Sequence, residues 1–116
     1  MSNRITGNSG EGLAVDFLQQ KGFVILERNW RHKFVEIDII ASQNGVLHFI
    51  EVKTRTSTTF GYPEESVSKK KMEQMKKGAE EYQYRNPQWK LVCFDVLAIN
   101  MYNDKIDYWF NEDVYF

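Results

Sequence analysis

Two segments of the chain space their hydrophobic residues as an amphipathic helix does. The first covers residues 8–22 and ends at Gly22, a residue type that readily follows the last turn of a helix. The second covers residues 64–85, where lysines surround one apolar face, and Asn86-Pro87 closes it. We therefore predict two helices.

Elsewhere the pattern is that of β-strands. The Asn44-Gly45 pair separates two segments of β character and is the strongest short-range signal of a hairpin. The run from Trp89 to Ile99 is almost continuously apolar, as in a strand buried on both faces. Five strands are predicted, at residues 23–31, 34–42, 46–55, 89–99 and 106–110.

The resulting order of elements, α-β-β-β-α-β-β, predicts the α/β class with a mixed central sheet flanked by helices. The 116 residues suffice for one core, so we interpret residues 1–116 as a single domain. Hydrophobic residues make up 42% and charged residues 27%, a balance that excludes a disordered chain.

Composition also narrows the cellular setting. No stretch approaches the roughly 18 apolar residues of a membrane span, and the N-terminus lacks a signal-peptide pattern, so we expect a cytoplasmic protein with no membrane partner. Cys93 is the single cysteine, and we interpret it as a core residue rather than part of a disulfide or a thiolate metal site. His32 and His48 are interpreted as too isolated to form a nucleophile and base pair.

Charge is spread unevenly along the chain. Residues 1–90 hold 14 Lys and Arg against 11 Asp and Glu, whereas residues 91–116 hold one Lys against five acids. The body is therefore mildly basic and the tail acidic, which argues against DNA contact by the tail. Its aromatic residues are expected to cover the sheet edge or to contact a second copy of the chain in a homodimer. These residues are Tyr108, Trp109, Phe110, Tyr115 and Phe116.

The hairpin carries the candidate chemistry. A two-residue loop at Asn44-Gly45 sets a register in which Asp38 faces Glu51 and Glu36 faces Lys53. Because side chains alternate between the faces of a strand, all four should lie on one face. Two carboxylates about 5 Å apart repel by roughly 3 kcal/mol at an effective dielectric constant near 20, and a bound Mg²⁺ or Mn²⁺ offsets that repulsion.

An ordinary ion pair on a solvated face is the alternative interpretation. Against it, Ile40 and Phe49 make the same face partly apolar, so we favour a metal site for Asp38, Glu51 and Lys53. For Glu36 the ion pair is preferred. Beside a metal ion, the Lys53 ammonium can orient a water molecule and stabilise developing negative charge, which suits hydrolysis of a phosphodiester.

The spacing of Asp38 and Glu51-Val52-Lys53 resembles the PD-(D/E)-x-K signature of restriction-endonuclease-like nucleases. A wider set of segments is similar to the uncharacterised YraN-like family over residues 9–99. Val35 departs from the glycine that this family usually has before E-I-D, and we expect only a change in strand packing there. The matching segments are GEGLAVDFLQQKGFVILERNWR, EIDIIA, FIEVKTR, FGYPEESV and FDVLAI.

The resemblance implies a restriction-endonuclease-like fold and a divalent-metal-dependent nuclease. It implies that Asp38 and Glu51 are metal ligands, that Glu11 is an accessory ligand and that Lys53 is catalytic; a similar quartet occurs in archaeal Holliday-junction resolvases. The backbone carbonyl of Val52 is a further candidate ligand. DNA is the expected substrate, and it could be branched or single-stranded.

Glu11 and a further candidate, Lys71, both have good alternative explanations. Glu11 could complete a capping box with Asn8 at the start of the first helix, and from the residues alone this explanation is preferred. Lys71 falls within the apolar stripe of the second helix, where its head group could simply reach water. We slightly favour a contact between Lys71 and a phosphate or the acidic site.

Nucleic-acid contacts are expected from Arg31, Arg55 and Lys71. Phe60 and Tyr62, in the predicted loop at residues 56–63, could stack on bases but are preferred as core contacts. Two alternatives to a nuclease stay open. One is a non-catalytic nucleic-acid-binding module of the same fold that acts in DNA uptake or repair, and the other is a scaffold without nucleic-acid affinity.

Overall fold

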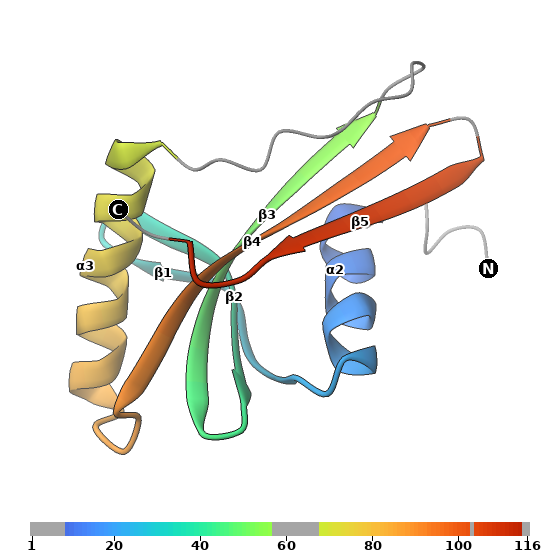
Figure 1. The fold of residues 1–116 in the computed structure, drawn as a ribbon. Helices are drawn as coiled ribbons and strands as arrows, with labels where there is room; N and C mark the ends of the chain where they lie inside the picture. Colours follow the sequence, from blue (N-terminus) through green and yellow to red (C-terminus); the bar gives the residue numbers. More distant parts are fainter. Residues whose placement is uncertain (1–8, 57–67, 103, 115–116) are drawn as a thin grey trace.

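The computed structural model describes residues 9–56, 68–102 and 104–114 (Figure 1). The order of elements is the predicted one. The helices and strands are α2 (Ser9–Gln20), β1 (Val24–His32), β2 (Val35–Gln43), β3 (Val46–Thr56), α3 (Lys69–Arg85), β4 (Leu91–Tyr102) and β5 (Lys105–Asn111).

The strands form one five-stranded sheet in the order β1-β2-β3-β4-β5. β3 and β4 are parallel and are joined through α3, whereas the other three neighbouring pairs are antiparallel. Parallel neighbours need a crossover connection, and α3 lies in the segment that makes it. The predicted α/β class with a mixed sheet is thus confirmed.

The two helices cover opposite faces of the sheet (Figure 1). Under α3 lies a hydrophobic cluster that includes Phe49 and Met75, and under α2 lies a second cluster that includes Leu18 and Ile50. At Gly78 the helix α3 approaches the sheet so closely that an added Cβ would lie 2.9 Å from Val35. Val35 therefore packs against α3, and the expected change in strand packing at this position stays a prediction.

The hairpin between β2 and β3 has the predicted register near its turn. Asn44 and Gly45 both have positive φ, at 53° and 80°, as a tight two-residue turn requires. The pairing runs from Gln43 opposite Val46 to Ile39 opposite Ile50. The described pairing stops there, so the predicted facing of Asp38 with Glu51 and of Glu36 with Lys53 does not occur as a ladder.

Several boundaries differ from the predictions. The second helix begins at Lys69, with the Ser68 hydroxyl accepting the N–H of Lys71 as an N-cap at 3.1 Å. Residues 64–67 of the predicted helix, most of the predicted loop with Phe60 and Tyr62, and the candidate cap Asn8 lie outside the described residues. β4 continues to Tyr102, beyond the predicted end at Ile99, because it pairs with both β3 and β5.

The acidic tail supplies the edge strand β5. Tyr108 stacks on Phe17 of α2 with ring centroids 4.6 Å apart, and Phe110 meets the same ring edge-on. Tyr108 and Phe110 thus lie on the edge strand and pack against α2, while contact with a second copy of the chain stays a prediction. Tyr115 and Phe116 lie outside the described residues. Within residues 9–56, 68–102 and 104–114, neither helix has the length and apolar character of a membrane span.

Candidate metal centre

The centre lies where β2 separates from β3. The Asp38 carboxylate accepts the backbone N–H of Val52 at 2.8 Å, so a side chain bridges the two strands beyond their last pair. Asp38 is half-buried, and desolvation by this burial raises the pKa of its carboxyl group, which the hydrogen bond from Val52 partly counteracts. The charges of Glu36 and Glu11 raise the same pKa further.

Glu51 on β3 is the second acid of the centre. Burial raises the pKa of its carboxyl group, and the charge of Asp38 raises it further, so the two carboxylates repel each other across the divergence. Lys71 of α3 lowers the pKa of Glu51 because its Nζ lies 3.4 Å from Oε1. That buried Oε1 makes this ion pair but accepts no hydrogen bond within the described part of the chain.

Glu11 lies in the first turn of α2. Its Oε2 accepts hydrogen bonds from Arg28 Nε at 3.0 Å and from Asn29 Nδ2 at 2.7 Å. A Cβ added at the preceding Gly10 would lie 2.6 Å from Thr54 Oγ1, so the start of α2 packs directly against β3. This close approach carries Glu11 to the edge of the acidic site.

A shallow hollow of about 170 Å³ is lined by Asp38 and Glu11 but not by Glu51. Asp38 and Glu11 line it from opposite sides, and Val52 contributes from β3. A larger hollow of about 380 Å³ lies elsewhere, between α3 and β4, and contains neither acid of the centre. We attach the chemistry to the smaller hollow because it contains the desolvated carboxylate of Asp38.

The other candidate residues lie on strands β3 and β1. Lys53 follows on β3, is half-buried, and lowers the pKa of Glu51 through its charge. Arg55 lies two residues further along the same strand and is also half-buried. Arg31 of β1 is exposed and pairs with Glu36 at 3.5 Å, so Glu36 takes part in an ion pair as preferred for it, with Arg31 as a partner.

His48, interpreted from the sequence as too isolated for a nucleophile and base pair, has a close polar neighbour in the structure. His48 Nδ1 lies 2.6 Å from Asp95 Oδ2, and both side chains are buried. Cys93 is only partly buried, and its Sγ lies 3.3 Å from the other oxygen of Asp95. Parallel pairing of β3 with β4 creates this cluster, and no local sequence motif indicates which residues such a pairing joins.

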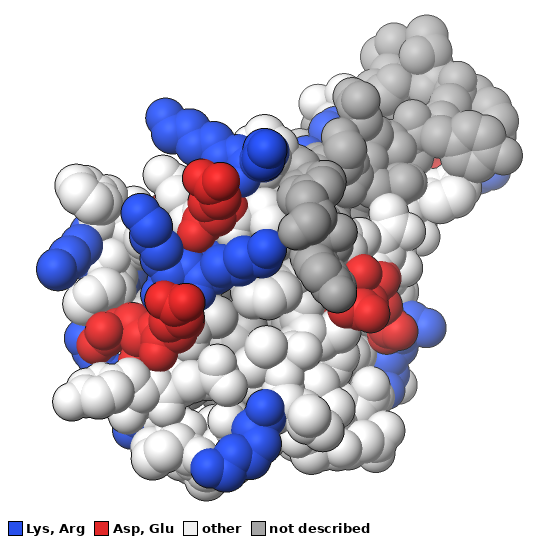
Figure 2. All heavy atoms as spheres, turned by 60° about the vertical axis from the view of Figure 1, so that its left-hand side comes forward, with Lys and Arg blue, Asp and Glu red and all other residues white. Residues whose placement is uncertain are grey.

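The charged surface around α3 is mixed. Figure 2 shows Lys and Arg side chains interleaved with Asp and Glu on the side of the molecule that carries this helix. Exposed lysines of α3 include Lys69, Lys70 and Lys77, and exposed acids of the same helix include Glu73 and Glu80. The predicted nucleic-acid contact by Lys71 of this helix therefore stays a prediction.

The residues of the centre suit a hard divalent cation. Two partly desolvated carboxylates repel each other, and one buried carboxylate oxygen has no hydrogen bond within the described residues. Carboxylate oxygens are the ligands that Mg²⁺ and Mn²⁺ prefer. Asp38 and Glu51 would hold such an ion, with Glu11 at the far side of the hollow.

The fold and the centre define a small mixed α/β domain with an acidic site at a strand divergence. The model of the uncharacterised protein family UPF0102 matches residues 10–99, and the chain belongs to this family. This confirms the resemblance to the YraN-like family.

Several curated relatives are similar over nearly their whole length. A UPF0102 protein of Dictyoglomus thermophilum is 44% identical over 100 residues, which cover 85% of each chain. One of Persephonella marina is 45% identical over 100 residues, covering 85% of this chain and 86% of the relative. One of Caldicellulosiruptor saccharolyticus is 42% identical over 110 residues, covering 92% and 93%.

Proposed function

We propose that this chain is a nuclease of the restriction-endonuclease-like kind that hydrolyses phosphodiester bonds of nucleic acid, with DNA as the preferred substrate, and that depends on Mg²⁺ or Mn²⁺. The observation that carries the proposal is the Glu51 carboxylate. It is desolvated, repelled by Asp38, and has a buried oxygen without a hydrogen bond among the described residues. A divalent cation bound by both acids would offset their repulsion and the cost of their desolvation, which the charge of Lys71 now compensates only in part.

Each side chain has a distinct part in the proposed reaction. Asp38 and Glu51 bind the ion, and the N–H of Val52 fixes the orientation of Asp38. When bound, the ion would act as a Lewis acid and would lower the pKa of the water molecule attached to it. Lys53 orients the attacking water and stabilises the charge that develops on the phosphate oxygens.

Substrate binding is assigned to residues around this centre. Lys71 is held against Glu51 by their ion pair and can contact a phosphate oxygen when the cation takes over the charge of Glu51. Arg55 extends the same strand beyond Lys53, and Arg31 lies on β1. Glu11 completes the ligand set from the far side of the hollow, and the Val52 carbonyl is a candidate backbone ligand.

Metal binding is tested by calorimetric titration of Mn²⁺ into the native chain and into Asp38→Asn. The asparagine keeps an oxygen that can accept the Val52 N–H, so it removes charge with little structural change. We expect Asp38→Asn to abolish the binding heat. The matched control is Asp104→Asn, an exposed acid before β5, which should bind as the native chain does. Equal heats for native chain and Asp38→Asn would refute the centre.

Turnover is tested on labelled duplex, single-stranded and branched DNA with Mg²⁺ or Mn²⁺, and with chelator as the blank. We expect Lys53→Ala to lower the cleavage rate by about 100-fold or more while Mn²⁺ binding persists. Lys105→Ala, an exposed lysine on β5, is the control. Salt-sensitive DNA binding without cleavage would favour the non-catalytic module, and cleavage that survives Lys53→Ala would point to a contaminating nuclease.

A further inference from the structure

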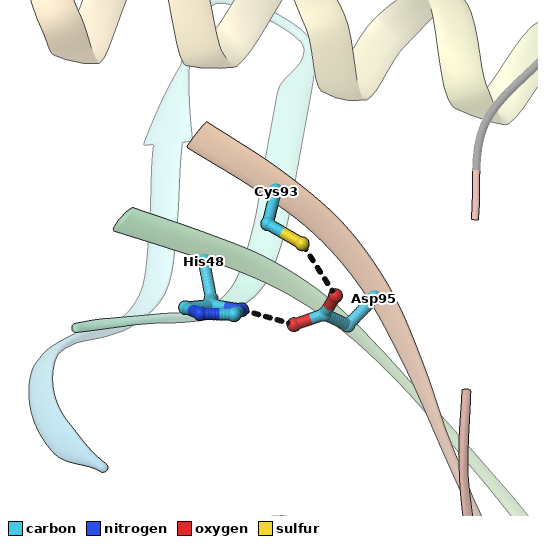
Figure 3. A group of neighbouring side chains, drawn as sticks. All are labelled: His48, Cys93 and Asp95. Atoms are coloured by element: carbon cyan, nitrogen blue, oxygen red, sulfur yellow. Dashed lines mark hydrogen bonds and ion pairs between the residues drawn. The ribbon is translucent and has the colours of Figure 1, made fainter. Parts of the chain in front are cut away.

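A second cluster of polar side chains lies on the face of the sheet that α2 covers. Glu51 reaches Lys71 on the α3 side, whereas His48 packs its ring edge-on against Phe23, which belongs to the cluster under α2. Parallel pairing places His48 beside Cys93, and Asp95 follows two residues later on the same side of β4. Figure 3 shows the three side chains converging.

The contacts within the cluster are short. Asp95 is fully buried, and its two oxygens face His48 Nδ1 at 2.6 Å and Cys93 Sγ at 3.3 Å. After β5 the chain returns to this point, and the N–H of Asp113 donates to Asp95 at 2.9 Å. The carboxylate of Asp113 then lies 3.8 Å from Cys93 Sγ.

The Cys93 thiol can donate a hydrogen bond to only one of the two carboxylates beside it. A thiol has a single hydrogen, but Cys93 Sγ lies against carboxylate oxygens of both Asp95 and Asp113. Burial, followed by the charge of Asp95, raises the pKa of the Cys93 thiol to about 12. The Asp95 carboxylate thus lies between an imidazole and a thiol, with the Asp113 carboxylate on the far side of the sulfur, and a cation among these groups would be bound by all four.

We propose that His48, Cys93 and Asp95, with Asp113 as the fourth ligand, form a binding site for a borderline-soft divalent cation of the Zn²⁺ type. Their donor set of one nitrogen, one sulfur and carboxylate oxygens is the set that Zn²⁺ takes in proteins. The donor atoms of His48, Cys93 and Asp95 all lie within 4.8 Å of one another. Tetrahedral Zn²⁺ separates its ligand atoms by about 3.3–3.7 Å, so side-chain shifts of about 1 Å suffice.

Ion binding has a defined proton balance. When the ion binds, the sulfur bonds to it as a thiolate and the Cys93 proton passes to solvent. His48 binds through the Nδ1 lone pair with its ring proton on Nε2, and the proton held between Nδ1 and Asp95 leaves that contact. At least one proton, that of the thiol, is therefore released for each ion bound. The site fastens the segment after β5 to β4 through Asp113, and it shares no residue with the proposed nuclease centre. It differs from the sequence-based interpretation of Cys93, because one thiolate suffices beside a histidine and two acids.

Cobalt titration of the full chain tests the proposal, with Co²⁺ as the spectroscopic probe for Zn²⁺. We expect one equivalent of Co²⁺ to produce thiolate-to-cobalt charge-transfer absorption in the near ultraviolet, and Zn²⁺ to abolish it while millimolar Mg²⁺ does not. Cys93→Ser should lose this absorption, whereas Asp38→Asn in the other centre should keep it. Calorimetry in buffers of different ionisation heat should report at least one released proton for each Zn²⁺ ion, and Cys93→Ser should release fewer.

A second variant guards against loss of folding in Cys93→Ser. Asp113 is exposed, so Asp113→Asn should fold normally and weaken Zn²⁺ binding by roughly 10- to 100-fold. Circular dichroism confirms the fold of each variant. Absence of the thiolate band in the native chain, its survival in Cys93→Ser, or unchanged Zn²⁺ affinity in Asp113→Asn would each overturn the proposal.

Discussion

Replacing Lys71 with methionine tests whether this lysine compensates Glu51. The Nζ of Lys71 lies 3.4 Å from Glu51 Oε1, and the two side chains are 32% and 17% exposed. At an effective dielectric constant near 20, that separation corresponds to an attraction of about 5 kcal/mol. Exposure of the lysine and the cost of desolvating it reduce the net value, and we expect Lys71→Met to lower the free energy of unfolding by about 1–2 kcal/mol at pH 7.

The loss of stability should depend on pH in a definite direction. The pKa of Glu51 in the folded chain lies above its ordinary value of 4.5, first because of burial, so the ionised carboxylate destabilises the fold. That penalty is absent below about pH 4.5, where the folded and unfolded chains both hold the proton. The penalty grows as pH rises from about 4.5 to the pKa of Glu51 in the folded chain. It should be larger in Lys71→Met, which lacks the compensating charge.

Urea unfolding between pH 4 and pH 8, with chelator present, measures this dependence. A loss of 1–2 kcal/mol shifts the midpoint by about 0.5–1 M urea. Lys70 is exposed and directly precedes Lys71 on α3. The variant Lys70→Met therefore controls for general effects of the substitution. If Lys71→Met and Lys70→Met lose the same stability at every pH, Lys71 does not compensate Glu51 and the acidic centre is wrongly described.

Two further predictions concern packing and metal affinity. Gly78→Ala should destabilise the chain by about 1–3 kcal/mol in urea unfolding, although alanine favours helix, because the new Cβ would lie 2.8 Å from Ile37 and 2.9 Å from Val35; equal or higher stability would refute the close approach of α3. Mn²⁺ affinity should fall as pH decreases through the raised pKa values of Asp38 and Glu51, since protons compete with the ion, and a flat profile between pH 4 and pH 7 in calorimetry would contradict this.

The sequence was sufficient to predict the architecture because its local signals agreed with one another. Asn44-Gly45 determined both the turn and the register of the adjoining pairs, which the structure confirms as far as Ile39 and Ile50. Gly22 follows the first helix with a φ of 94°, as its position predicted. Such features depend on a few neighbouring residues, and their physical cause is contained within the segment itself.

Contacts that depend on distant segments were harder to predict. The cluster of His48 with Cys93 arises only when β4 returns parallel to β3, and residues 48 and 93 carry no local signal of that pairing. Lys71 is an intermediate case. Its position in an apolar stripe marked it as unusual, but the sequence alone left two explanations, and the ion pair with Glu51 now accounts for it.

The register extrapolation failed at Asp38 for the same reason that makes this position a site. In a continued ladder a backbone carbonyl of β2 would accept the next N–H of β3, but at Val52 the Asp38 side chain accepts it instead. The two strands therefore part, and the gap lets Glu11 approach from α2 to line a hollow with Asp38. An acid at this position both ends the pairing and lines the opening, which a sequence pattern of alternating faces does not encode.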